Sequence, residues 1–213
     1  MGFMATAPTT SARPYGGVDA ADRLASRRSR LLEAGLDLLG GDVAAELTVR
    51  GVCRQAGVAA RYFYESFTDK DEFVGAVFDS VIAELAFTTQ AAVDAAPPEE
   101  QTHAGMTNIV RTIGGDRRVG RLLFSVQLAN AVLARKRVES NALFAMLSGR
   151  HAGNALQVPQ NDRITAAAHF VVGGVAQTIS AWLAGDVRLK PDQLVDQLTS
   201  LLNELANPSL YLD

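Results

Sequence analysis

The sequence predicts an all-α fold, and three observations support this prediction. Apolar residues recur at helical spacing along nearly the whole chain, alternating strand patterns and Asn-Gly hairpin signals are almost absent, and pairs of Gly or Pro residues separate the periodic segments. The chain has 213 residues, of which 48% are hydrophobic and 20% charged. This length and composition are those of one large globular domain or two small ones.

Residues 1–22 are expected to form a flexible N-terminal tail. They are rich in Ala, Thr, Gly and Pro, and they contain neither a basic stretch nor an apolar run of signal-peptide length, so secretion is not expected. The chain has one cysteine, Cys53, which allows no internal disulfide and fits a reducing compartment. We therefore expect a cytoplasmic protein.

Two helices are expected between the tail and Gly57. The first has an apolar stripe and ends at Gly40-Gly41 after about three turns. Thr48 can cap the second, and Gly57 ends it. The inward residues of the two helices share spacings of three, four, seven or eight: Leu31, Gly35, Leu38 and Leu39 in the first, then Val49, Val52, Cys53 and Ala56 in the second. Cys53 is interpreted as a core residue, because a nucleophile needs a neighbouring base that the local sequence does not offer.

The segment VAARYFYESF, residues 58–67, is expected to form one short helix. Thr68-Asp69-Lys70-Asp71 follows it with the form of a capping box that opens another helix. Two short helices joined across a glycine and packed on a preceding helix form a helix-turn-helix, whose second helix enters the DNA major groove. Val58, Phe63 and Phe67 can face inward. The remaining residues give a small, basic and aromatic surface: Ala60, Arg61 and Tyr64, with Tyr62 at its border.

The stretch TVRGVCRQAGVAARYFYESFTDKDEFVGAVF, from Thr48 to Phe78, resembles the DNA-binding signature of the TetR family of transcriptional regulators. The matching positions are Gly57-Val58, Phe63-Tyr64, Phe67 and Lys70. Three positions depart from the family pattern: Ala59 replaces a frequent Ser or Thr cap, Gly51 a frequent acid, and Ser66 a frequent His.

This resemblance implies double-stranded DNA as a partner and assigns a role to each matching position. Thr48 and Lys70 would contact phosphates, and the planar fork of Arg61 would contact a guanine. Tyr62 and Tyr64 would bind phosphates or thymine methyl groups. Further phosphate, minor-groove or groove-surface contacts would come from Arg27 and Arg28 ahead of the first helix, Arg50 and Ala60. The alternative is that the tyrosines are half-buried packing residues and the arginines a solvated face.

The charge distribution favours DNA binding only in the N-terminal part. The net charge is −3, but residues 23–70 carry eight Lys/Arg against six Asp/Glu, and residues 71–213 carry eleven against fifteen. We expect residues 23–70 to form the DNA-binding domain and residues 71–213 a larger ligand-binding and dimerisation domain. The small positive excess disfavours a nonspecific architectural DNA binder.

The larger domain is expected to be helical throughout. The predicted helices span residues 68–94, 101–113, 117–128, 130–152 and 164–185, and a last helix follows Pro191. Residues 164–185 carry no formal charge and are long enough to cross a bilayer. Their polar residues and helical stripe favour a soluble helix instead, so no membrane is expected.

The last two long helices of TetR proteins commonly form a four-helix interface with a second copy, so the resemblance implies a homodimer. The residues expected at this interface form apolar stripes: Val171, Val175, Ile179, Trp182, Leu194, Leu198, Leu201, Leu202 and Leu205.

The resemblance also implies a pocket for a largely apolar small-molecule effector between residue 79 and about residue 180. Residues that can line the pocket, although ordinary core is the favoured interpretation of each, are Met106, Val110, Leu123, Gln127, Phe144, Met146, His169 and Phe170. No cofactor, metal site or enzyme activity is expected, because the histidines are scattered and no catalytic motif occurs. The resulting hypothesis is a dimeric, ligand-responsive regulator, a repressor by resemblance. The alternative is a helical carrier or enzyme with a non-functional helix-turn-helix.

Overall fold

The computed structural model describes residues 17–41, 47–125, 130–157 and 159–210, and every regular element in these ranges is helical. This confirms the all-α prediction. The elements are α1 (Gly17–Gly40), α2 (Val49–Ala56), α3 (Ala60–Tyr64), α4 (Lys70–Asp94), the short 3₁₀ helix η1 (Pro98–Glu100), α5 (Gln101–Gly115), α6 (Arg117–Phe124), α7 (Ala131–Leu156), α8 (Asp162–Ala184), α9 (Pro191–Glu204) and η2 (Pro208–Leu210).

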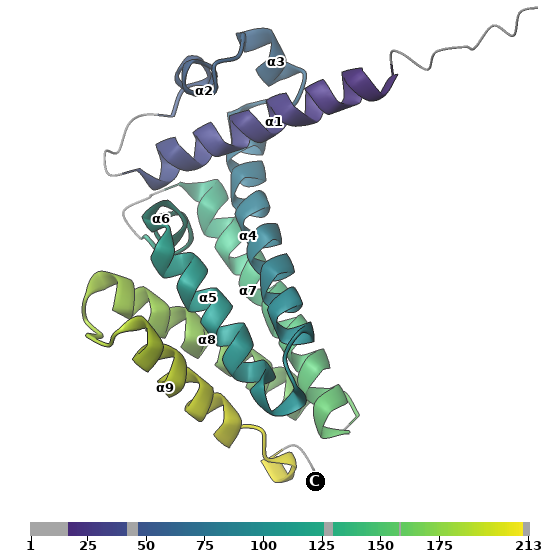
Figure 1. Cartoon of the computed structure of the whole chain (residues 1–213), viewed down its shortest axis with the longest axis vertical. Coiled ribbons are helices and arrows are strands. Elements are labelled where there is room, and N and C mark those ends of the chain that lie inside the picture. Colours follow the sequence, from purple (N-terminus) through teal and green to yellow (C-terminus); the bar gives the residue numbers. More distant parts are fainter. Residues whose placement is uncertain (1–16, 42–46, 126–129, 158, 211–213) are drawn as a thin grey trace, which may run out of the picture.

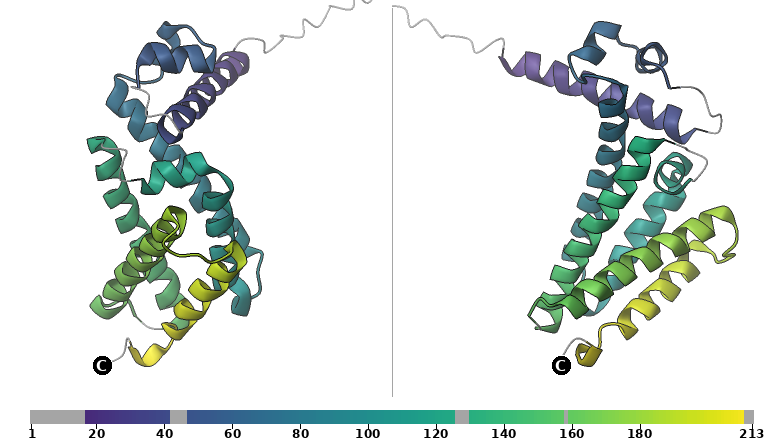
Figure 2. Two further views of the ribbon diagram at one scale, coloured as in Figure 1. Left: turned by 90° about the vertical axis from the view of Figure 1, so that its left-hand side faces the viewer. Right: turned by 180° about the vertical axis from the view of Figure 1, so that it is seen from behind.

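The helices form a small N-terminal unit on one end of a larger helical body (Figure 1). In the N-terminal unit, α2 and α3 lie together on one side of α1. The long helix α4 leaves this unit and runs down the body beside α5 and α7, while α8 and α9 lie at the opposite end (Figures 1 and 2). The end of α1 packs on α6, so the unit is joined to the body at two places, through α4 and through α6.

Helix α1 starts earlier than the sequence indicated. It begins at Gly17 and has 24 residues, so residues 17–22, expected as tail, are helical, and the estimate of about three turns is wrong. The physical reason is that residues 18–30 contain no Gly or Pro and are rich in Ala and Arg, which favour helix. Residues 1–16 lie outside the described ranges.

The boundaries of α2 agree with the sequence prediction. The Thr48 hydroxyl accepts a hydrogen bond from the Gly51 amide at 3.1 Å, which caps the helix. Gly57 ends it with a φ of 63°, in the left-handed region where glycine is favoured. Arg30 of α1 adds a second restraint, because its Nη2 donates to the carbonyls of Ala56 at 2.5 Å and Gly57 at 3.0 Å.

Helix α3 is shorter than residues 58–67, since only Ala60–Tyr64 are helical. Ala59 stands at its N-cap without a side-chain hydrogen bond, as expected for the residue that replaces a Ser or Thr. The cap of α4 is Asp69, whose carboxylate accepts from the Glu72 amide at 2.8 Å. Glu72 accepts from the Thr68 amide at 2.7 Å, one residue before the Asp69 cap, so α4 is capped by Asp69 and the box expected from Thr68 to Asp71 is not the one that forms.

An aromatic cluster anchors the helix-turn-helix. Phe63 and Phe67 are fully or almost fully buried, as the sequence predicts, and their rings pack on Phe73 in the first turn of α4. The ring centroids are 5.2 Å apart for Phe63 and Phe73, and 5.0 Å for Phe67 and Phe73. One core therefore continues from α3 into α4, and it also receives Val52, Cys53 and Ala56 from α2.

The body differs from the sequence prediction mainly in its joints. Helix α6 ends at Phe124, four residues before the expected end at 128, and the joint to α7 includes residues 126–129, which lie outside the described ranges.

Helices α4 and α8 are long and apolar enough to cross a membrane by length and composition. Both contribute buried side chains to the protein, such as Phe73 and Val74 in α4 and Ile164 and Ile179 in α8.

The packing of α1 on α4 gives a first testable prediction. A Cβ added at Gly35 would lie 2.5 Å from Val77 Cγ2 and 2.6 Å from Phe73 Cζ, and both side chains are buried. We expect Gly35→Ala to lower the free energy of unfolding by about 1 to 3 kcal/mol, because the overlap outweighs the better helix propensity of Ala. The measurement is urea denaturation. Gly115→Ala, at the end of α5 with nothing within 4 Å of the added Cβ, is the matched control and should not be destabilising.

Candidate nucleic-acid interface

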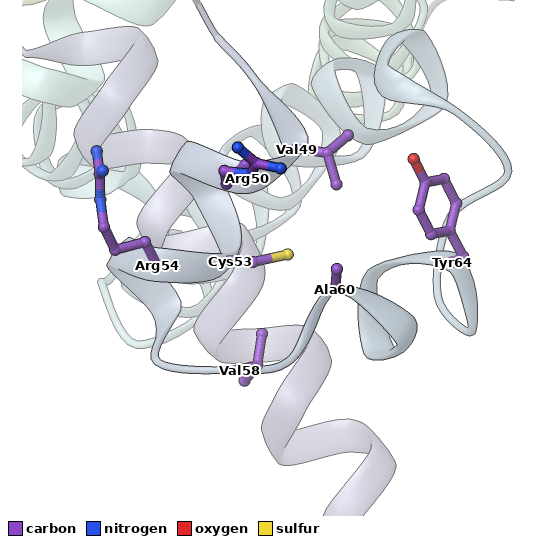
Figure 3. Close-up of a pocket in the computed structure, with 7 residues that line it drawn as sticks. All are labelled: Val49, Arg50, Cys53, Arg54, Val58, Ala60 and Tyr64. Carbon is purple, nitrogen blue, oxygen red and sulfur yellow. The ribbon is translucent and has the colours of Figure 1, made fainter.

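A hollow of about 460 Å³ lies between α2 and α3 on the surface of the N-terminal unit (Figure 3). Helix α2 supplies an apolar floor and two arginines, while α3 supplies the opposite wall. The lining residues are Val49, Arg50, Cys53, Arg54, Val58, Ala60 and Tyr64. Arg50, Ala60 and Tyr64 were expected at the DNA surface, and the structure brings these three side chains to one hollow.

Arg54 is a site residue that the sequence interpretation missed. It is exposed and lines the hollow together with Arg50, which lies four residues earlier on the same helix. Residues at this spacing lie on one face of a helix, so the two guanidinium groups share a face of α2. That spacing was the signal that could have identified Arg54. The hollow thus has two cations from α2 and an aromatic side chain from α3.

Arg61 and Tyr62 form a stacked group with Arg27 of α1. The Arg27 guanidinium carbon lies 4.1 Å from the centre of the Tyr62 ring, and that of Arg61 lies 4.6 Å from it. Arg61 Nη2 also donates to the Tyr62 hydroxyl at 2.6 Å. This hydrogen bond and the nearby positive charge of Arg61 lower the pKa of the Tyr62 phenol. Arg61 is exposed on α3 while its guanidinium is held against the Tyr62 ring.

The sequence prediction placed Arg27 and Arg28 ahead of the first helix, and this is wrong. Both residues lie within α1, because that helix starts at Gly17. Arg28 donates to the carbonyl of Ser66 at 3.2 Å, and its guanidinium carbon lies 4.5 Å from the centre of the Phe67 ring. Arg28 therefore holds the turn after α3 against α1. Its charge is part of the scaffold of the helix-turn-helix.

The two residues expected to contact phosphates lie at helix starts. Thr48 caps α2 and is exposed to solvent. Lys70 is exposed at the first position of α4, directly after the Asp69 cap. Backbone amides at a helix start favour an anion, and Lys70 adds a positive charge there.

Cys53 lies in the floor of the hollow and is only 5% exposed. Burial raises the pKa of its thiol, which disfavours the reactive thiolate. This agrees with its interpretation as a core residue. Among the described residues, no group of three His, Cys, Asp or Glu side chains could hold a metal ion.

The structure does not gather the expected effector-pocket residues in one place. Val110 and Leu123 are buried in the main core, and Met106 packs against it. Met146 and His169 line a hollow of about 340 Å³ between α7 and α8, with Ala142, Ala145, Arg150, Gln160 and Thr165. Phe144 is half-buried and Phe170 is exposed, and neither is among those lining residues. Gln127 lies outside the described residues.

The expected dimer-interface residues fall into two groups. Ile179, Leu194 and Leu198 are buried inside the protomer, so their side chains already pack in its own core and do not face a partner. Val175 and Trp182 pack against this core as well. The others keep accessible surface: Leu201 is 54% exposed, and Val171, Leu202 and Leu205 are half-buried.

Comparison with solved structures identifies the fold. The fatty acid degradation regulator FadR from Bacillus halodurans has a TM-score of 0.68 and 15% identity, covering 83% of this chain and 94% of that chain. FadR from Bacillus subtilis in complex with stearoyl-CoA has a TM-score of 0.67 and 16% identity, covering 82% of this chain and 96% of that chain. A TetR-family regulator from Streptomyces coelicolor has a TM-score of 0.66 and 15% identity, covering 87% of this chain and 85% of that chain. No protein-family model matches the sequence, and no curated protein is significantly similar to it.

The class defined by these observations is a helix-turn-helix unit mounted on a helical body. Within that class, the chain has the fold of the TetR-family transcriptional regulators. At these identities the likeness concerns the fold. Function is therefore inferred from the surface of α2 and α3.

The Arg61–Tyr62 pair gives a second prediction. Because the Arg61 hydrogen bond and charge favour the phenolate, Arg61→Met should raise the pKa of the Tyr62 phenol. NMR titration of ¹³C-labelled tyrosine at alkaline pH measures this, with Tyr62→Phe used to assign the signal. Arg135→Met, on the exposed side of α7, is the control and should leave the Tyr62 titration unchanged. An unshifted Tyr62 pKa in Arg61→Met would contradict the pairing.

Proposed function

We propose that this protein is a DNA-binding transcriptional regulator that acts as a homodimer and responds to a small molecule. One observation carries the proposal: exposed Arg50, Arg54 and Tyr64 line one hollow between α2 and α3, while the inner faces of the same helices are locked into the core. Helix α3 also exposes Arg61, beside this hollow's wall residue Ala60 in the sequence. A cationic and aromatic surface on a rigid support is what DNA binding needs.

In this proposal α3 enters the major groove as the recognition helix. Arg61 reads a guanine, because its hydrogen bond to the Tyr62 hydroxyl uses only Nη2 and leaves N–H groups on its other nitrogens for hydrogen bonds to the base. Arg50, Arg54 and Tyr64 contact the edges of the groove, and Thr48 and Lys70 bind phosphates. Two copies related by a twofold axis read a pseudo-palindrome with half-sites about one helical turn apart.

The regulatory part of the proposal rests on the helical body. Exposed apolar side chains on α8 and α9, among them Phe170 and Leu201, favour a second copy as the partner of this end. The Bacillus subtilis FadR structure contains stearoyl-CoA, which supports a largely apolar effector for this fold. Effector binding then shifts α4, and α3 moves with it because both share the phenylalanine core. We propose that the DNA-bound protein represses transcription and that the effector releases it from DNA. The protein acts in the cytoplasm.

The alternative function is a helical carrier or enzyme whose helix-turn-helix does not bind DNA. The exposed apolar groups and the hollow between α7 and α8 suit that alternative equally well. The cationic hollow on α2 and α3 does not, because a carrier has no use for it. Selection of the purified protein against random duplex DNA at physiological salt separates the two functions. Enrichment of a pseudo-palindrome supports the regulator, and no enrichment, with and without a cell extract of small molecules, contradicts it.

Two substitutions test the proposed contacts. Arg61→Ala should relax the choice at one base pair per half-site, with a loss of about 1 to 3 kcal/mol of discrimination, because a bidentate guanine contact is removed. Lys70→Ala should weaken all sequences about evenly and reduce the salt slope by about one, because it removes a phosphate contact. Fluorescence anisotropy on the selected site and its single-base variants measures both. An even loss in Arg61→Ala would make Arg61 a phosphate contact instead.

A charged residue introduced on the proposed interface of α8 and α9 tests whether this face forms the dimer. Leu201→Glu should convert the dimer to monomers, since an unpaired carboxylate would be buried at the contact. Leu143→Glu is the matched control, because Leu143 is an exposed leucine on α7, and this variant should remain dimeric. Sedimentation velocity gives the masses. A dimeric Leu201→Glu protein would remove this face from the proposed interface.

A further inference from the structure

Arg118 lies where the DNA-facing unit meets the helical body. It is the second residue of α6, and its guanidinium reaches the carboxylates of Glu33 and Asp37, which lie one turn apart on α1. The contact to Glu33 is 2.7 Å long, and Arg118 also pairs with Asp37. Because both ends of one helical turn are held by the same group, sliding and rotation of α1 over α6 are both restrained.

The guanidinium is also fixed relative to α6 itself. Asp116, the N-cap of α6, accepts from Arg118 Nε at 3.0 Å and from Nη2 at 2.6 Å, and it accepts from the Arg118 amide at 2.9 Å. These bonds lower the pKa of the Asp116 carboxyl. The side chains of Arg118, Asp37 and Asp116 are only 33–34% exposed, so the cluster is sheltered more than an ordinary surface ion pair.

The same cluster continues into the helix-turn-helix. The second carboxylate oxygen of Asp37 accepts a hydrogen bond from Gln55 Nε2 of α2 at 3.2 Å. A chain of polar contacts therefore runs from α6 through Arg118 and Asp37 to α2. The backbones also approach closely here, since a Cβ on Gly40 would overlap the backbone of Arg118. Figure 1 shows α6 directly beneath this end of α1.

The N-terminal unit is tied to the body through α4 and through the packing of α1 on α6, and the polar cluster reinforces this second attachment. A unit held by one helix can turn about that helix, whereas a second attachment at α6 removes this freedom. In a dimer, each body carries one unit, so a turn of the unit changes the distance between the two recognition helices. Moving one half-site by one base pair changes the required distance by about 3.4 Å.

We infer that Arg118, held by Glu33, Asp37 and Asp116, is a positioning residue that sets the half-site spacing accepted by the dimer. This inference rests on the proposed function and deepens it. Arg118 touches no DNA in this role. It acts through α1 and α2 on the distance between recognition surfaces, and it leaves the base preference within each half-site to α3.

The test uses the full-length protein and a series of duplexes. Each duplex carries two copies of the selected half-site, and the spacing between the copies changes by one base pair from one duplex to the next. Fluorescence anisotropy gives the dissociation constant for each duplex. Wild type should prefer its best spacing over the adjacent spacings by about tenfold, and Arg118→Met should reduce this preference to about threefold or less. The base preference within a half-site should stay unchanged.

A second variant guards against a local defect in α6. Glu33→Gln with Asp37→Asn removes the α1 carboxylates but keeps Arg118 and its Asp116 contact, and it should broaden the spacing preference in the same way. Arg135→Met is the matched control, because Arg135 pairs with Glu139 of the same helix at 3.6 Å, and it should keep the wild-type profile. Circular dichroism checks that each variant is folded.

The outcomes separate the inference from the proposed function. A wild-type spacing profile in both cluster variants overturns the inference while the regulator stands. An even loss of affinity at every spacing, or a changed base preference, also overturns it, because Arg118 would then support the reading surface and not its placement. If wild type itself enriches no paired half-sites, the proposed function fails.

Discussion

The packing of Phe63 and Phe67 on Phe73 is the interaction on which the candidate interface depends. Helix α3 has five residues, far fewer than a helix needs to be stable in water alone, and its N-cap residue Ala59 offers no side-chain hydrogen bond. Its geometry is therefore imposed by the buried phenylalanine rings. Phe73 belongs to the first turn of α4, the long helix that runs into the body. The candidate interface on α3 and the helix α4 therefore share one core. Any displacement of α4 must carry α3 with it.

Two groups of arginines in the N-terminal unit have different roles, which explains how a chain of net charge −3 can present the proposed DNA-binding surface. Arg28 and Arg30 bind backbone carbonyls at the ends of short helices, where the negative end of the helix dipole and unpaired carbonyl groups favour a cation. Arg50, Arg54 and Arg61 remain on the surface. Placement, and not the number of charges, makes this unit suited to DNA.

Helix α1 connects these features because three of its faces are in use. Gly35 allows the close approach of α4, Arg27 stacks on Tyr62, and Glu33 and Asp37 meet Arg118. The helix that supports α3, the proposed recognition helix, is thus the same element that meets α6. At the other end of the body, α8 and α9 divide their apolar residues between the protomer's own core and an accessible face. A body built this way can couple events at one end to the placement of α3 at the other.

The sequence by itself determined the features that depend on neighbours within a turn or two. The all-α class, the Thr48 cap, the helix end at Gly57 and the inward Phe63 and Phe67 follow from local hydrogen bonding and helical spacing, so they could be predicted without a structure. Only the tertiary structure decided which partner each side chain meets. Arg118 and Asp37 are 81 positions apart, and an apolar stripe such as that of Leu194 and Leu198 looks the same whether it packs on α5 of its own chain or on a second copy. Periodicity fixes which face of a helix is apolar, but the surface that covers this face is chosen by the packing of the whole chain.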